Sequence, residues 1–391
     1  MNITDVGHLT GDNEGDADHG EDRMEKWARQ QGITARDVAA KFTAIYEEDL
    51  NLLRIDPFDV MPKATDHIAE QISLIQELEN KGYTYSIPND GIYMDTSKIS
   101  GKDTSPYGVL LGEKHLAGLE HGARITDSGK KNPTDFALWK FNTTGKKRDM
   151  ERESPRGVGF PGWHIECSAM SIKYLGTHID IHTWGMEHIA VHHTNEIAQS
   201  ECSHAHIPRV NYRVHYQWLM MNGKKIAKSD GNVAFLNEVL ERGYSPLDMR
   251  YFYLQAHYRS FQDFTWEALE AAKKARTGLM KKIAWGLTPT PAQEQEIIEE
   301  LLNDLNTWGV LGKLHTYGCP KWLDEYVLKL DLFALPEQVA VVVPHEIEAL
   351  AAQRREAKQN KDFAQADSLR KQIETAWRTI IDTPTWWTRE K

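Results

Sequence analysis

Residues 161–202 constrain the fold more than any other part of the chain. They read PGWHIECSAMSIKYLGTHIDIHTWGMEHIAVHHTNEIAQSEC and hold six of the 17 histidines and two of the three cysteines. The apolar, β-tending run from His178 to His182 predicts a strand that ends in a turn at Gly185. The residues on both sides of this strand have helical patterns, and the second pattern begins at Ile189. A helix, a strand and a second helix in this order indicate an α/β unit.

Three side chains in this stretch could bind a metal ion. His192 and Glu196 are four residues apart, which places them on one face of the predicted helix. Cys167 opens the preceding helical run and reaches the same place if the strand packs between the two helices. Thiolate, imidazole and carboxylate together suit Zn²⁺, and three protein ligands leave one position open. The spacing alone is loose, because histidines in helices and single buried cysteines more often serve hydrogen bonding and packing.

The composition sets broad limits on the class of protein. With 391 residues the chain is long enough for two or three domains. Its net charge of −11 argues against a protein that coats nucleic acid without specificity. No run of about 18 apolar residues predicts a membrane helix, and the first residues do not resemble a signal peptide. Because three scattered cysteines also suit a reducing compartment, we expect a cytoplasmic protein without membrane contact.

The rest of the chain predicts helices around a strand-rich insertion. Residues 24–54 and 66–81 have amphipathic helical patterns, whereas 83–160 contain short strand-like pieces such as YTYSIP and GIYMDT. From residue 245 onward the sequence is mostly helical. A basic face in this region is either a solvated surface or a contact for RNA phosphates.

A lysine-rich loop follows the turn that the pair Asn222-Gly223 predicts. It holds Lys224, Lys225 and Lys228. A cationic loop of this kind can bind phosphate groups. Taken alone, the segment is more typical of a solvated hairpin tip, so both interpretations stay open.

Four motifs, taken in order, resemble one known family. PGWHIECSAM, HIDIHT, HHTNEIAQSE and NGKKIAKSDGN are similar to segments of cysteinyl-tRNA synthetase, a class I aminoacyl-tRNA synthetase. Further similar segments, including NPTDFALWK and NKDFAQADSLRKQI, extend the resemblance over nearly the whole chain. The resemblance implies an α/β fold: a Rossmann-like catalytic domain that lacks its first strand–helix unit, with an inserted α+β segment and a C-terminal α-helical bundle.

The same resemblance divides the chain into five regions. The first half of the catalytic domain takes residues 1–82, the inserted connective segment 83–160, and the second half with the zinc site 161–215. The signature loop and the stem-contact region take 216–266, and a helical tRNA-binding region takes 267–391.

The resemblance also implies roles for individual residues. Cys167, His192 and Glu196 match three of the family's four zinc ligands. The zinc ion of the family binds the thiolate of the substrate cysteine, which separates cysteine from serine. The residues that match the family's amino-acid pocket are Thr4, Trp163 and His164, and the one that matches a histidine near the substrate is His182. Those that match the ATP site are Gly185 and Glu187, with Glu187 at the ribose. The signature loop contains Lys225, Lys228 and Ser229. Of these, Lys225, Lys228 and His182 are the predicted catalytic residues.

The implied reaction has two steps. The carboxylate of L-cysteine attacks the α-phosphate of ATP, with Mg²⁺, to give cysteinyl-adenylate, and the 3′ end of tRNA(Cys) then takes the cysteinyl group. The resemblance thus implies one Zn²⁺ per chain, Mg²⁺ with ATP, and a cytoplasmic monomer that binds tRNA(Cys), ATP and L-cysteine.

The sequence departs from the family pattern at its beginning. The family starts with a strand that carries the fourth zinc ligand, a cysteine, and continues with a His-Ile-Gly-His motif that binds ATP; neither is found in this sequence ahead of Asn2. We expect such an N-terminally truncated chain to be impaired in turnover. Cys202 lies about 15 Å beyond His192 along a helix and does not replace the ligand. Two alternatives stay open: a non-catalytic RNA- or zinc-binding remnant, and a cysteine ligase of the mycothiol pathway.

Overall fold

Two compact units make up the chain, Met1–Phe333 and Ala334–Lys391. The computed structural model describes residues 1–6, 9–10, 21–99, 102–111, 129–142, 151–205, 207–226, 236–334, 349–350, 352–354, 356–357 and 362–381. The five regions predicted from the sequence are finer than these two units, and they stay a prediction.

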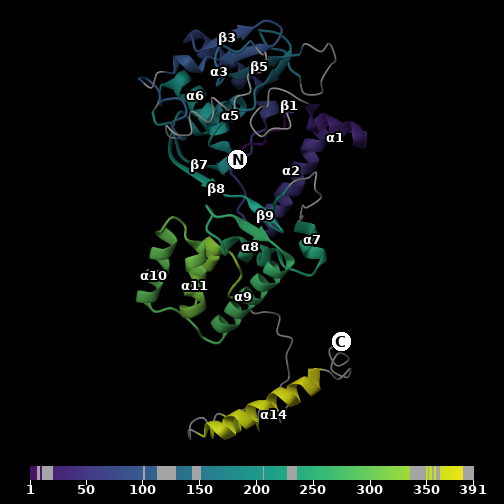
Figure 1. Ribbon diagram of the computed structural model, residues 1–391, viewed down its shortest axis with the longest axis vertical. Helices are drawn as coiled ribbons and strands as arrows, with labels where there is room; N and C mark the ends of the chain where they lie inside the picture. The colour runs from purple at the N-terminus through teal and green to yellow at the C-terminus, as the bar shows by residue number, and fades with distance from the viewer. Residues whose placement is uncertain are drawn as a thin grey trace. The chain divides into compact units, whose positions relative to one another are not determined.

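A parallel pair of strands and its crossover helix hold the stretch 161–202. Strand β7 (Ile179–Gly185) pairs in parallel with β8 (Val210–Tyr216), and helix α6 (His192–His204) lies between them in the sequence. A short 3₁₀ turn, η3 (Met186–His188), follows β7. Helix α5 (Ile165–Leu175) precedes β7 and packs against α6 (Figure 1). This arrangement confirms the predicted order of helix, strand and helix and the α/β class.

Helix α6 is buried along most of its length although many of its side chains are polar. Buried polar groups need hydrogen-bond partners, and several side chains of α6 find them on other elements. The Tyr107 hydroxyl donates to Asn195 Oδ1 at 2.6 Å, and the Ser168 hydroxyl donates to Gln199 Oε1 at 2.6 Å. These contacts fix the rotation of α6 about its axis, and so they fix where its first turn points.

An antiparallel sheet forms the strand-rich insertion. Its strands lie in sequence order: β3 (Thr84–Ile87), β4 (Gly91–Met94), β5 (Phe136–Phe141) and β6 (Gly159–Pro161), with the 3₁₀ turn η2 (Thr96–Lys98) after β4. The strands expected at YTYSIP and GIYMDT are confirmed. Helix α3 (Ile68–Asn80) shares one hydrophobic core with this sheet, α5 and α6. The insertion therefore supports the two helices on which Cys167, His192 and Glu196 lie.

The N-terminal segment lies beside the start of α3. Ile3 forms a parallel bridge with Lys63, just before the 3₁₀ turn η1 (Ala64–Asp66). Strands β1 (Leu9–Thr10) and β2 (Glu21–Asp22) pair antiparallel, and the helices α1 (Arg23–Gln31) and α2 (Ala35–Leu52) follow. The pattern over 24–54 therefore forms two helices. They separate at Gly32, whose φ of 68° suits glycine, and Thr34 caps α2 with a capping box.

A second small sheet contains the turn predicted at Asn222-Gly223. Strand β9 (Leu219–Met221) pairs antiparallel with β10 (Lys224–Lys225) and parallel with β11 (Gln262–Phe264). Asn222 and Gly223 have φ values of 52° and 73°, as a tight hairpin turn requires. The segment before this turn forms two strands, β8 and β9, which belong to different sheets.

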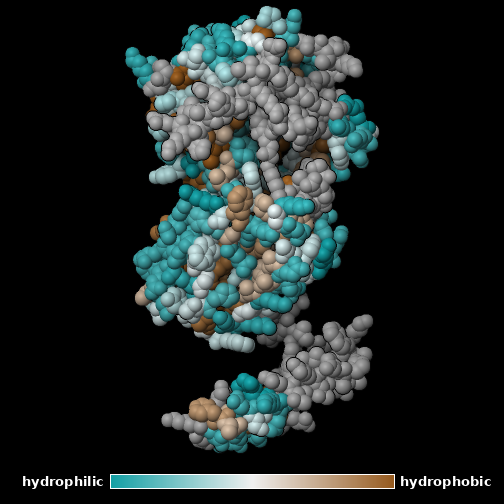
Figure 2. Space-filling model, viewed as in Figure 1, coloured by the Kyte–Doolittle hydropathy of each residue, from teal (hydrophilic) through white to brown (hydrophobic). Residues whose placement is uncertain are grey.

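Helices form the remainder of the first unit, as the sequence predicts. They are α7 (Leu236–Glu241), α8 (Pro246–Leu254), α9 (Trp266–Ala284), α10 (Pro291–Leu302), α11 (Thr307–Tyr317), α12 (Lys321–Leu323) and the π-helix η5 (Asp324–Leu328). They enclose a core that includes Leu269, Leu279, Ile297 and Leu314, all fully buried. The face of these helices visible in Figure 2 is mainly hydrophilic, with scattered apolar residues, as is usual for a protein surface.

The second unit contains α14 (Phe363–Ile381), drawn in yellow in Figure 1. Ala366 and Leu369 of this helix are buried with Ala357, and Leu350 packs against them. Among the helices in the described part of the chain, none is both long and apolar enough to cross a bilayer.

Candidate metal centre and active site

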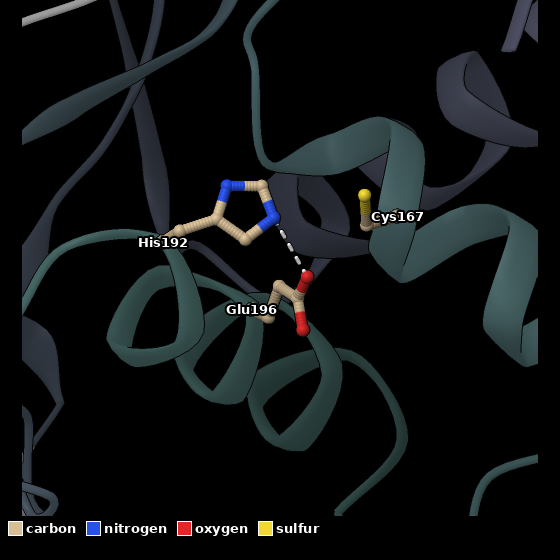
Figure 3. Close-up of side chains that lie close together, drawn as sticks. All are labelled: Cys167, His192 and Glu196. Atoms are coloured by element: carbon tan, nitrogen blue, oxygen red, sulfur yellow. Dashed lines mark ion pairs between the residues drawn. The ribbon is translucent and has the colours of Figure 1, made fainter. Parts of the chain in front are cut away.

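Helices α5 and α6 bring the three predicted metal ligands together. Cys167 lies in the first turn of α5, His192 begins α6, and Glu196 follows one turn later. All three side chains are buried, and one donor atom from each lies within 4.8 Å of the others. Figure 3 shows the imidazole, the carboxylate and the thiol converging on one region between the helices. The fold thus brings Cys167 close to His192 and Glu196, as the sequence predicts for a packed arrangement of the two helices.

The two carboxylate oxygens of Glu196 face two different histidines. Oε1 lies 2.9 Å from His192 Nε2, and Oε2 lies 2.7 Å from His182 Nε2. Burial alone would raise the pKa of this carboxyl. The rings of His182 and His192 outweigh that effect, and the pKa of Glu196 lies well below its usual value. Glu196 is therefore a carboxylate, the form that binds a metal ion.

The surroundings of Cys167 favour the protonated, uncharged form of its thiol. Burial, and then the negative charges of Glu196 and Glu166, raise its pKa well above the usual value for cysteine. A nearby divalent cation would reverse this effect, because a thiol that coordinates such an ion loses its proton. The side chain of Asn2 acts in the other direction and lowers the pKa of the same thiol, so the first residues of the chain lie near this place.

The donor set fits zinc on chemical grounds. Thiolate, imidazole and carboxylate are its usual protein ligands. Glu196 Oε1 is buried and makes no well-directed hydrogen bond in the described structure, although His192 Nε2 lies only 2.9 Å away. An imidazole nitrogen that carries no proton and this carboxylate oxygen are close enough to bind one cation between them.

A cluster of aromatic and histidine rings surrounds the metal donors. The ring of Trp163 packs against His192 with 4.7 Å between ring centres, and His164 Nδ1 lies 3.0 Å from His192 Nδ1. Trp163 and His164 are thus placed beside the metal donors, where the sequence analysis expected the amino acid. Thr4 is half-buried and lies two residues after Asn2, which contacts Cys167. The roles of these three residues stay predictions.

Three further histidines, for which the sequence predicts no role, belong to the cluster. His193 Nδ1 lies 2.8 Å from His215 Nε2, and the ring of His188 lies 5.2 Å from that of His192. Burial lowers the pKa of His188 to about 4 and that of His193 to about 2, so both rings are neutral near pH 7. His182, His193 and Glu196 form a second group of donors within 4.8 Å. The adjacent residues His192 and His193 are the feature of the sequence that indicates a histidine cluster here.

The residues predicted at the ATP lie at the carboxyl end of β7. Gly185 ends this strand, and Glu187 lies in the turn η3 that follows. Glu187 accepts a hydrogen bond of 2.6 Å from the indole N–H of Trp218, a residue without a predicted role. Ligands of α/β proteins bind beyond the carboxyl ends of parallel strands, so Gly185 and Glu187 lie where a nucleotide is expected.

The structure describes only the start of the predicted signature loop. The backbone of Lys225 pairs with Met220 in the β9–β10 hairpin. The side chain of Lys225, together with Lys228 and Ser229, lies outside the described residues. The phosphate-binding role of these three residues stays a prediction.

Comparisons with known proteins agree with this geometry. A family model described as the class I (C) tRNA synthetase catalytic domain matches residues 16–274. A protein named cysteine–tRNA ligase 1 from Burkholderia lata is 42% identical over 98% of this chain and 82% of its own length. A cysteine–tRNA ligase from Treponema denticola is 44% identical over 78% of this chain and 60% of its own length.

Solved structures show the same fold at low sequence identity. A Mycobacterium tuberculosis methionyl-tRNA synthetase, in complex with methionyl-adenylate, superposes with a TM-score of 0.51 at 14% identity. The match covers 83% of this chain and 80% of that chain. At this identity the likeness concerns the fold alone.

The parallel β7–β8 unit, the donors on α5 and α6 and the family match define a class I aminoacyl-tRNA synthetase. Such proteins are ligases that join an amino acid to tRNA. Within this class, the identities of 42% and 44% show that the chain belongs to the cysteine–tRNA ligase family.

Proposed function

We propose that this chain activates L-cysteine with ATP and transfers it to tRNA(Cys), with a zinc ion held by Cys167, His192 and Glu196. The observation that carries the proposal is the buried convergence of these three donors in a member of the cysteine–tRNA ligase family. A bound zinc ion supplies a soft Lewis-acid position that takes the thiolate of cysteine in preference to the hydroxyl of serine.

The residues around the metal donors hold the amino acid. Trp163 and His164 form a wall beside His192, and Trp163 is only half-buried, so its ring can cover a small side chain. Neutral His188, in ring contact with Trp163 and His192, adds polar but uncharged surface. Recognition of the sulfur atom is then assigned to the metal position.

The nucleotide binds beyond the carboxyl end of β7. Glu187 accepts hydrogen bonds from the ribose hydroxyls, and Gly185 allows close approach of the backbone. Lys225, Lys228 and Ser229 bind the phosphates of Mg²⁺–ATP and offset negative charge as pyrophosphate leaves. The cysteine carboxylate attacks the α-phosphate and displaces pyrophosphate. A hydroxyl of the terminal ribose at the 3′ end of the tRNA then attacks the carbonyl of the cysteinyl-adenylate and displaces AMP. We assign tRNA contacts to the helices after residue 266.

The proposal is tested by cysteine-dependent ATP–pyrophosphate exchange on the 391-residue chain, with serine as the competing substrate and zinc content measured on the same preparation. We expect about one zinc per chain and exchange that cysteine stimulates and serine does not. The sequence contains no His-Ile-Gly-His motif, so we expect a low rate. A chain that binds neither zinc nor cysteine would overturn the assignment.

The same preparation separates the proposal from the mycothiol-pathway alternative. A tRNA ligase transfers the activated cysteine to tRNA(Cys), whereas the alternative enzyme transfers it to an amino sugar. Transfer to an amino sugar with no transfer to tRNA would therefore favour the alternative.

A further inference from the structure

The indole of Trp218 is joined directly to the carboxylate of Glu187. The Trp218 Nε1–H group donates to Glu187 Oε2 at 2.6 Å, a short hydrogen bond of the charge-assisted type. The two residues are 31 positions apart and lie next to strands of different sheets. Glu187 follows β7, and Trp218 immediately precedes β9. This bond links the β7–β8 pair to the hairpin that begins the lysine-rich loop.

The carboxylate of Glu187 lies folded over Gly185. A Cβ atom added to Gly185 would lie 2.3 Å from Oε2 and 2.5 Å from Oε1. Its φ is −69°, so Gly185 is needed here for space and not for a special backbone conformation. Glu187 is 38% exposed, and its Oε1 lies 3.5 Å from His188 Nδ1, on a ring whose pKa is lowered to about 4 by burial. The carboxylate thus keeps lone pairs that a solute can reach.

Trp218 is itself held on several sides. Its backbone N–H donates to Gln217 Oε1 at 3.1 Å, and its carbonyl accepts from Gln262 N at 3.5 Å. Its ring packs against Phe261 with 6.0 Å between ring centres. The backbone of Gln217 is tied in turn to Tyr258 by a bond of 2.7 Å. The indole N–H therefore projects from a backbone fixed by β9 and β11.

We propose that Trp218 is a positioning residue that holds the Glu187 carboxylate in place to accept hydrogen bonds from the ribose hydroxyls of ATP. The inference rests on the proposed nucleotide site. One lone pair of Oε2 is used by the indole, and the partial exposure of the Glu187 side chain leaves the carboxylate within reach of a ribose. Because Trp218 adjoins β9, the same strand fixes the position of the ribose contact and the position at which the lysine-rich loop begins.

The test measures binding of Mg²⁺–ATP and of Mg²⁺–2′,3′-dideoxyATP to the 391-residue chain by titration calorimetry. The wild-type chain is expected to bind ATP at least about tenfold more tightly than the dideoxy analogue. Trp218→Phe keeps an aromatic ring and removes the N–H donor, so it should weaken ATP binding about tenfold, or about 1.4 kcal/mol, and leave dideoxyATP binding unchanged. Trp308→Phe, on an exposed ring of α11, is the matched control and should change neither.

A double-mutant cycle separates positioning from a general structural effect. In a Glu187→Ala background, Trp218→Phe should cause no further loss of ATP affinity, because no carboxylate is left to position. A Trp218→Phe chain that keeps the wild-type preference for ATP would overturn the inference and leave the proposed function intact. A wild-type chain that binds both nucleotides equally would overturn the ribose contact itself, and the inference with it.

A second variant covers the case in which Trp218→Phe does not fold. Gly185→Ala displaces the flexible end of Glu187, leaves the Trp218 side chain itself unaltered and suits the local φ of −69°. It should also remove the preference for ATP over dideoxyATP. If Gly185→Ala folds and retains that preference, the carboxylate position is not what selects the ribose, and the inference fails.

Discussion

His182 Nε2 lies 2.7 Å from Glu196 Oε2, while the other oxygen of the same carboxylate faces His192. His182 comes from β7 and Glu196 from α6, so this contact joins the strand to the helix that carries two metal donors. Residues that hydrogen-bond a metal ligand orient it and tune its charge. His182, predicted from the sequence to be catalytic, is placed to orient Glu196.

We therefore predict that His182→Phe weakens zinc binding by about 10- to 100-fold, the usual effect of losing a hydrogen bond to a metal ligand. Zinc affinity is measured by competition with a chromophoric chelator. His178→Gln, just before the start of the same strand, should leave zinc affinity unchanged, since the His178 ring lies 3.2 Å from the Pro208 carbonyl, at the other end of the strand from His182. Equal affinity in the wild-type and His182→Phe chains would show that Glu196 is oriented without His182.

The two cysteines near the centre give a matched pair of variants. Both are buried, but Cys167 lies with His192 and Glu196, whereas Cys202 packs in the core of α3, α5 and the antiparallel sheet. Cys167→Ser should lower zinc affinity by at least about 100-fold, because a neutral hydroxyl is a poor ligand for zinc. Cys202→Ser should retain zinc, with metal content read by elemental analysis. Loss of zinc from the Cys202 variant alone would place the metal elsewhere.

The part of the site that the sequence predicts is the part that depends on local periodicity. His192 and Glu196 share a face because a helix repeats every 3.6 residues, and Asn222-Gly223 is a turn because of its backbone preferences. Contacts between elements distant in the sequence were not predictable in this way. The bond from Trp218 to Glu187 depends on how two sheets meet, and the break between β8 and β9 depends on pairing partners that no local pattern encodes.

The helical core offers a pH-dependent prediction through His315. Burial, and then the charge of Lys282, lower the pKa of this ring, which lies 2.7 Å from the Tyr251 hydroxyl. In the unfolded chain a histidine titrates near 6.5, so the unfolded state takes up the proton first as pH falls. His315 therefore makes its full contribution to the free energy of unfolding above about pH 6.5. This contribution is lost as the pH falls toward the pKa of the ring in the folded state.

His315→Gln should therefore make the free energy of unfolding less dependent on pH below about 6.5. The slope of the free energy of unfolding against pH should fall by at most about 1.4 kcal/mol per pH unit, and by less where solvent screens the ring. Urea unfolding at pH 7, 6 and 5 measures this slope. Tyr251→Phe keeps the imidazole, so it should lower stability by about 1 kcal/mol at each pH and retain the slope. An unchanged slope in the His315 variant would contradict the assignment.

Arg250 joins the end of α2 to the π-helix of the helical region. Its guanidinium donates to three carbonyl oxygens, Leu53 O at 2.8 Å, Leu328 O at 2.6 Å and Val327 O at 3.3 Å. Lysine retains the charge but cannot reach three acceptors in this fork geometry. Arg250→Lys should therefore lower the free energy of unfolding by about 1–3 kcal/mol, because the part-buried carbonyls of Leu53 and Leu328 lose charged donors. Arg156→Lys, in a surface ion pair with Glu79, should cost less than about 1 kcal/mol in the same urea titration. Equal losses in the two variants would mean that the three carbonyl contacts of Arg250 add nothing beyond an ordinary surface charge.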